Sequence, residues 1–101
     1  MEYSSKQDGT NCEFNFLGTF SFSDNENVRK LIEEFKSSGC SRCSVQLGAL
    51  EDIDSAGLGM LILIDEAVKE DGKSVEFVGP TGQVERMLEI SKFSEIITIR
   101  R

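Results

Sequence analysis

One short segment constrains this chain more than any other: residues 54–59, which read DSAGLG and are followed by the apolar residues 60–64. A hydroxyl stands beside a carboxylate, just after a short predicted strand and just before a predicted apolar helix. A serine at such a boundary can cap the helix, and its hydroxyl lies near backbone N–H groups that attract anions. The two glycines leave room for close approach by another protein's backbone or by a nucleotide. We interpret Ser55 as a phosphorylation switch.

Length, charge and the lack of histidine limit the possible functions. With 101 residues, no internal repeat and no long linker, the chain has the length of one small domain. The net charge of −7 disfavours nucleic acid or an anionic membrane as the main partner, because both bind basic patches; it favours a basic protein surface. The absence of histidine excludes Ser-His-Asp triads and histidine metal sites. We therefore expect no enzymatic activity, no cofactor and no metal.

The N-terminal residues favour a cytoplasmic protein. Residues 1–11 are polar, lack an apolar stretch of the signal-peptide type, and are predicted to form a flexible tail before a domain over residues 12–101. The longest apolar run, residues 56–64, is much shorter than the ~20 residues that span a bilayer. We expect a cytoplasmic location and no membrane contact.

The chain has three cysteines, an odd number that fits a reducing compartment better than a disulfide scaffold. Cys40 and Cys43 have the C-x-x-C spacing of thiol redox sites. They follow a predicted helix instead of opening one, so the helix dipole that lowers a thiol pKa in redox sites is missing. A metal site would have only Cys12 as an obvious third ligand. We interpret them as incidental thiols, with redox or metal function as the alternative.

Hydrophobic periodicity predicts an α/β fold, with a mixed sheet of about five strands and three main helices. Phe20 and Phe22 alternate with polar residues, which predicts that both are buried in a second strand. Ser23 and Glu26 have the spacing of a capping box. The predicted elements are strands at 12–16 and 19–22 in a hairpin turning at Gly18, a helix from Ser23 to a stop at 37–39, a strand at 44–47, a loop over 48–53, a helix over 55–71, a strand at 75–78, a helix capped by Thr81, and a last strand at 96–99.

With its elements in this order, the chain resembles the STAS domain family, and within it the bacterial anti-sigma factor antagonists. The resemblance covers about residues 12–99. Its most specific part is residues 47–59, which read LGALEDIDSAGLG. Members of the family have there a strand ending in leucine, a short loop and then Asp-Ser-x-Gly-Leu-Gly. Residues 72–78 and 84–97 are similar to the family's strand after this helix and to its last helix and strand.

The resemblance implies roles for particular residues. Phosphorylated members are modified on the serine after the aspartate, which corresponds to Ser55; Ala56 removes the second hydroxyl that some members carry there. The early hairpin of the family often reads Gly-x-Leu-Asp, but residues 18–21 read GTFS, so Ser21 replaces the acid and Asp24 follows three residues later. The partner-binding residues implied by the resemblance are Asp54, Ala56, Gly57, Leu58, Gly59, Ser21 and Asp24.

The resemblance also implies a cycle. The unphosphorylated protein binds an anti-sigma factor that is also a serine-protein kinase, which frees the sigma factor for transcription. The kinase then phosphorylates Ser55 and the complex dissociates, and a PP2C-type serine phosphatase restores the binding form. Two alternatives remain: a non-enzymatic STAS adaptor in a larger complex, and a nucleotide-binding STAS domain that uses Gly57 and Gly59. The second departs from a P-loop, because Met60 and Leu61 follow the glycines where a P-loop has lysine.

Overall fold

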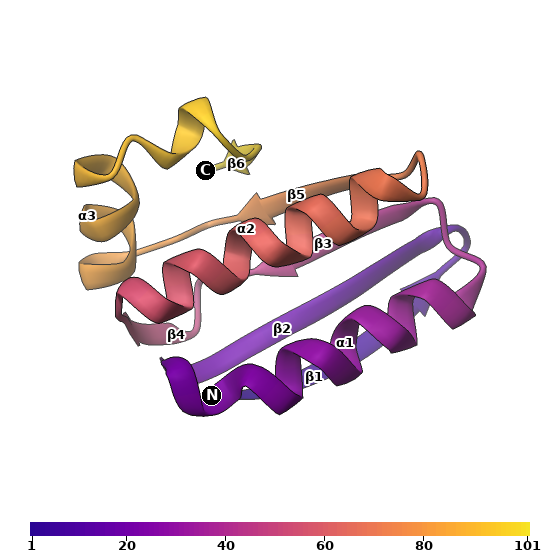
Figure 1. Cartoon of the computed structure of the whole chain (residues 1–101), viewed down its shortest axis with the longest axis horizontal. Helices are drawn as coiled ribbons and strands as arrows, with labels where there is room; N and C mark the ends of the chain where they lie inside the picture. Colours follow the sequence, from indigo (N-terminus) through magenta and orange to yellow (C-terminus); the bar gives the residue numbers. More distant parts are fainter.

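Two helices lie side by side against one face of a six-stranded mixed sheet in the computed structural model, which describes all 101 residues (Figure 1). The strand order is β1-β2-β3-β5-β6, and β4 pairs with the C-terminal part of β2. Only the β1–β2 pair is antiparallel. The elements are β1 (Glu2–Asp8), β2 (Asn11–Phe20), the 3-10 helix η1 (Phe22–Asp24), α1 (Asn25–Ser38), β3 (Arg42–Gln46), β4 (Leu50–Ile53), α2 (Ser55–Glu70), β5 (Ser74–Val78), α3 (Gly82–Ile90), the 3-10 helix η2 (Phe93–Glu95) and β6 (Ile99–Arg100).

The two faces of the sheet follow from the alternation of residues along its strands. Phe14 of β2 lies beside Val45 of β3, which lies beside Phe77 of β5, and all three are buried. The residues between them face the other way, where Lys6 and Glu13 form an ion pair at 3.6 Å between Nζ and Oε2. A sheet with one packed face and one solvated face has this period-two pattern.

The helices close the packed face with apolar stripes. Val28, Leu31 and Phe35 of α1 are buried, and α1 ends at Gly39, whose φ of 78° is a left-handed conformation that glycine adopts without strain. Helix α2 buries residues at the same helical spacing, including Leu61 and Ile64. No helix has both the length and the apolar character needed to cross a bilayer.

The structure confirms the α/β class and the mixed sheet, and corrects the beginning of the chain. Residues 2–8 form strand β1 instead of a flexible tail. The hairpin is therefore β1–β2, and it turns at Gly9, with a φ of 61°, and not at Gly18, which lies within the continuous strand β2. The polar sequence of β1 hid it: as an edge strand with most side chains exposed, it lacks the apolar alternation by which strands are recognised.

Four further local predictions were wrong. Phe22 is not buried in a strand but lies in η1, 72 % exposed. The capping contact joins Asp24 to the N–H of Ser21 at 2.9 Å, and not Ser23 to Glu26, because the 3-10 turn precedes α1. The expected loop over 48–53 contains strand β4, and the last strand is only Ile99–Arg100. Short strands of four and two residues carry too little periodicity to be recognised.

Candidate functional site at the start of helix α2

The DSAGLG segment lies where β4 ends and α2 begins, beyond the C-terminal ends of the parallel strands β2 and β4 (Figure 1). Asp54 joins the two elements in an extended conformation, with φ of −104° and ψ of −178°. Its backbone N–H donates to the carbonyl oxygen of Phe20 at 3.2 Å, which fixes the junction to the last residue of β2. Parallel α/β sheets place ligand chemistry at this edge, where the sequence analysis predicts Ser55 to lie.

Asp54, and not Ser55, caps helix α2. Its Oδ1 accepts a hydrogen bond from the Gly57 N–H at 2.8 Å, which satisfies one of the N–H groups that have no partner within the helix. The negative charge at this end also interacts favourably with the helix dipole. A carboxylate at this position stabilises the helix by about 0.5–2 kcal/mol relative to alanine. The hydroxyl of the neighbouring Ser55 is therefore not needed to cap the helix.

Ser55 is the first residue of α2 and is exposed to solvent. Its hydroxyl makes no hydrogen bond to another residue of the chain, because Asp54 already provides the cap. The backbone beneath it is held on both sides, by β4 and by the first turn of α2. The hydroxyl is therefore accessible to another molecule, on a backbone that the neighbouring strand and helix hold in place.

The two glycines of the segment have different roles. A Cβ atom at Gly57 would lie 2.6 Å from the carbonyl oxygen of Phe20 and 2.7 Å from Cγ1 of Ile53, so α2 packs there against β2 and β4. Gly57 is thus required by the fold and offers no open cradle for a nucleotide phosphate. A Cβ at Gly59 would meet nothing within 4 Å, and Gly59 is exposed. Of the two, only Gly59 leaves space for an approaching partner.

The remaining residues of the segment also fall into a buried group, which supports the fold, and a group at the surface. Leu58 is only 6 % exposed and belongs to the core, so it supports the site from within. Ala56 is half-buried, and Asp54 is exposed beside its cap contact. The surface available to a partner is therefore made by Asp54, Ser55, Ala56 and Gly59 and not by the whole motif.

Gln83 of α3 contacts the site from the side of β4, a role that the sequence analysis did not predict. Its Nε2 donates to the carbonyl oxygen of Ile53 at 2.9 Å, and its Oε1 accepts from the Ile53 N–H at 2.9 Å. The side-chain amide thus pairs with the last residue of β4 in the way that a neighbouring strand would. One glutamine in a helix has no motif, because its role depends on a contact 30 residues away in the chain.

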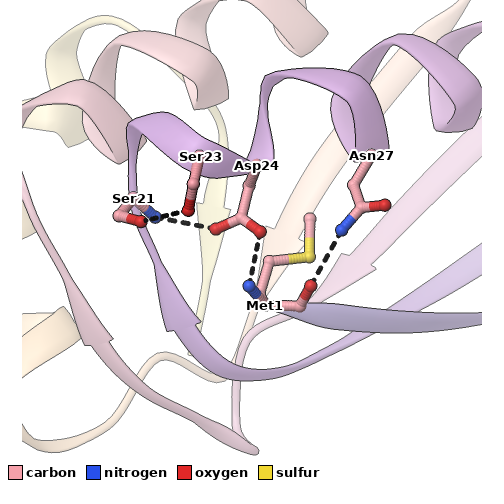
Figure 2. A network of polar contacts seen from close by, with 5 residues as sticks. All are labelled: Met1, Ser21, Ser23, Asp24 and Asn27. Atoms are coloured by element: carbon pink, nitrogen blue, oxygen red, sulfur yellow. Dashed lines mark hydrogen bonds and ion pairs between the residues drawn. The ribbon is translucent and has the colours of Figure 1, made fainter.

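Figure 2 shows how Ser21, the residue before η1, and Asp24, the last residue of η1, are arranged. Asp24 is 5 % exposed, and its Oδ1 lies 2.5 Å from the Met1 amino nitrogen while its Oδ2 accepts from the Ser21 N–H. Asn27 Nδ2 donates to the Met1 carbonyl at 2.9 Å, and the hydroxyls of Ser21 and Ser23 are 3.0 Å apart. The Asp24 carboxylate is thus used within the molecule, where it orders η1, and only Ser21 of this pair reaches solvent.

Phe22 is an exposed residue near the site, although the sequence analysis predicted that it is buried in a strand. It follows Ser21 in η1, which packs against α2, and it exposes 72 % of its surface. Phe20, two residues earlier, is buried and binds the Asp54 N–H through its carbonyl. The sequence analysis extended the strand two residues too far. Strand β2 ends at Phe20 and the 3-10 helix η1 follows, so the alternation that would bury Phe22 no longer applies.

The site is acidic. Glu51, Asp52 and Asp54 are all exposed, and none of them takes part in an ion pair of the structure. Their charges favour a basic partner surface. A phosphate on Ser55 would add about −1.5 to −2 charges, and the helix terminus offsets such charge by only about 0.3–1 kcal/mol.

The chain belongs to the STAS domain family. The family model described as "Mlab, STAS domain" matches residues 6–98, nearly the whole chain. A relative from Thermotoga neapolitana, named a putative anti-sigma factor antagonist and a homolog of TM1081, is 32 % identical over 69 residues. That match covers 68 % of this chain and 61 % of the relative, so it spans about three fifths of the relative's length.

Solved structures show the same fold. The anti-sigma factor antagonist SpoIIAA in its unphosphorylated form has a TM-score of 0.79 at 10 % identity, with 97 % of this chain and 87 % of that chain covered. The Bacillus cell fate determinant SpoIIAA in its phosphorylated form has a TM-score of 0.72 at 11 % identity, covering 97 % and 90 %. At such identities the likeness concerns the fold alone.

The different contacts of the two glycines give a prediction about stability. We expect Gly57→Ala to lower the free energy of unfolding by about 1–3 kcal/mol, because the new methyl group would displace the backbone of β2. Gly59→Ala should raise it by about 0.5–1 kcal/mol, because alanine favours a helix and the position is open. Urea unfolding followed by circular dichroism measures both. Equal effects of the two substitutions would contradict the packing described for Gly57.

Proposed function

We propose that this chain is a phosphorylation-controlled anti-sigma factor antagonist without enzymatic activity of its own. Its unphosphorylated form binds an anti-sigma factor that is also a serine-protein kinase, and phosphorylation of Ser55 ends that binding. One observation carries the proposal. The Ser55 hydroxyl is exposed and makes no hydrogen bond within the chain, because Asp54 beside it caps the helix. The naming of the Thermotoga relative as a putative anti-sigma factor antagonist supports it.

The partner-binding surface combines the start of α2 with η1. Phe22, Asp54 and Gly59 are exposed on it, Ser21 and Ala56 are half-buried at its edge, and Asp24, Gly57 and Leu58 hold these residues in place from within. An exposed aromatic ring beside polar groups is typical of a residue that contributes strongly to binding. The acidic residues around Ser55 attract a basic patch on the partner.

Phosphorylation switches the surface by charge. The partner contact is built around a neutral hydroxyl, and a phosphate places about two further negative charges among Glu51, Asp52 and Asp54. The bulk and hydration of the phosphate also prevent close packing against the first turn of α2. Because Ser55 is exposed, a PP2C-type phosphatase in the cytoplasm can reach the phosphoserine and restore the binding form.

One prediction of this proposal concerns the modified residue. We expect incubation with ATP and an anti-sigma factor kinase from the same genome to add one phosphate, on Ser55. The tryptic peptide of residues 43–69 contains only two hydroxyl side chains, Ser44 and Ser55. Ser44 is 7 % exposed, so fragment ions from this peptide should place the phosphate on Ser55.

Two variants control this experiment. Ser55→Ala should abolish phosphorylation, whereas Ser94→Ala, which removes an exposed hydroxyl outside η1 and α2, should leave it unchanged. Calorimetry should then show that the kinase binds the protein phosphorylated on Ser55 at least about tenfold more weakly than the unmodified one. Persistent modification of Ser55→Ala would refute the assignment. Equal affinities would refute the switch and favour the adaptor alternative.

A second prediction tests the exposed ring. Phe22→Ala should weaken binding to the same kinase by about tenfold or more, because an exposed aromatic anchor is lost. Its effect on unfolding should be small, since Phe22 is 72 % exposed in the free protein. Ile96→Ala removes another exposed apolar side chain, 49 % exposed and outside η1 and α2, and should leave affinity unchanged. If both variants bind as the wild type does, the partner surface does not include η1.

A further inference from the structure

Three buried thiols gather at the end of the sheet opposite Ser55. Cys12 of β2 lies beside Cys43 of β3 in the strand register, and Cys40 lies two residues after the end of α1. Their exposures are 5 %, 1 % and 0 %, respectively. The Sγ atoms of Cys12 and Cys40 are 2.6 Å apart. The C-x-x-C spacing pointed to Cys40 and Cys43, but the fold brings Cys40 against Cys12.

We propose that Cys12 and Cys40 are a redox modification site, a pair of thiols that a peroxide oxidises to an intramolecular disulfide while Cys43 stays a free thiol. A disulfide needs sulfurs about 2.0 Å apart, so the two Sγ atoms have to move together by only about 0.6 Å. The two residues are 28 positions apart in the chain, and their proximity therefore comes from the tertiary fold.

A surface groove gives a small oxidant access to this pair. The groove has a volume of about 340 Å³ and reaches Cys12 but not Cys40. Its lining residues are Ser5, Lys6, Gln7, Cys12, Glu34 and Ser38. Hydrogen peroxide entering there meets Cys12 first, and Cys40, which does not line the groove, acts as the second thiol.

The reaction balances with one peroxide. The Cys12 thiolate attacks one oxygen of hydrogen peroxide, the O–O bond breaks, and the leaving hydroxide takes a proton to become water. The Cys40 sulfur then attacks the Cys12 sulfenic acid; an S–S bond forms, the S–O bond breaks, and a second water leaves. Two thiols and one hydrogen peroxide thus give one disulfide and two waters.

The environments of the thiols set the rate and the selectivity. Burial raises the pKa of Cys12 above its ordinary value, so little thiolate is present near neutral pH and oxidation is slow. Burial raises the pKa of Cys43 to about 12, which keeps this residue a thiol. The pair therefore responds to sustained oxidant and not to brief exposure.

The bond would tie together segments that already touch. The N–H groups of Ser41 and Arg42 donate to the Thr10 carbonyl at 2.9 and 3.2 Å, so the chain after α1 is already fixed to the start of β2. A cross-link in this place restricts the unfolded chain more than the folded one, which stabilises the protein. The Ser55 surface lies at the other end of β2 and keeps its geometry.

Peptide mapping of the wild-type protein tests the proposal. The protein is treated with hydrogen peroxide, unfolded, alkylated and cut with trypsin, which cleaves after Lys36 and Arg42 and so separates Cys40 from Cys43. We expect peptide 7–29 linked by a disulfide to peptide 37–42, with Cys43 alkylated in peptide 43–69. A link between 7–29 and 43–69, or alkylation of all three cysteines, would overturn the proposal.

Matched variants and a melting curve complete the test. Peroxide should raise the thermal midpoint of the wild type and of Cys43→Ala, and a reductant should reverse the rise. Cys40→Ala should form no internal disulfide and show no rise. A rise in Cys40→Ala, or loss of the bridge in Cys43→Ala, would contradict the pairing. The wild-type peptide map decides the matter even if a variant does not fold.

Discussion

The contacts of Asp54 determine how the rest of the site is arranged. Its N–H binds the Phe20 carbonyl at the end of β2, and its carboxylate binds the Gly57 N–H in the first turn of α2. Helix α2 can approach this close only because Gly57 has no side chain at a point where a Cβ would lie 2.6 Å from the same Phe20 carbonyl. The cap and the glycine together hold Ser55 exposed on a fixed backbone.

The residues around this junction fall into two groups, those that stabilise the fold and those that remain at the surface. Four residues make contacts only within the molecule. Leu58, Asp24 and Gln83 do so through their side chains, and Gly57 does so because it has none. Ser55, with Gly59 and Phe22, is left at the surface. Under the proposed switch, a phosphate on Ser55 would meet an assembled, acidic helix terminus and would act mainly on the partner's contact and not on the fold of this chain.

Much of the fold and the position of the site could be predicted from the sequence. The helices with strong apolar periodicity and the DSAGLG segment placed Ser55 correctly at the start of α2. The polar edge strand β1 and the short strand β4 were missed, because neither shows an apolar alternation. The roles of Asp54, Gly57 and Gln83 depend on contacts with β2 and β4, which become visible only once the chain is folded.

The most direct test of a rigid, charge-based switch is an NMR comparison of two forms of this protein. One form carries a genetically encoded phosphoserine at position 55, and the other is unmodified. The rigid switch predicts amide shift changes confined to residues near the junction, in 20–24, in 51–60 and at Gln83, with the remaining peaks unmoved. Shift changes throughout α1, β3 and β5 would mean that phosphorylation rearranges the fold, and would contradict the mechanism.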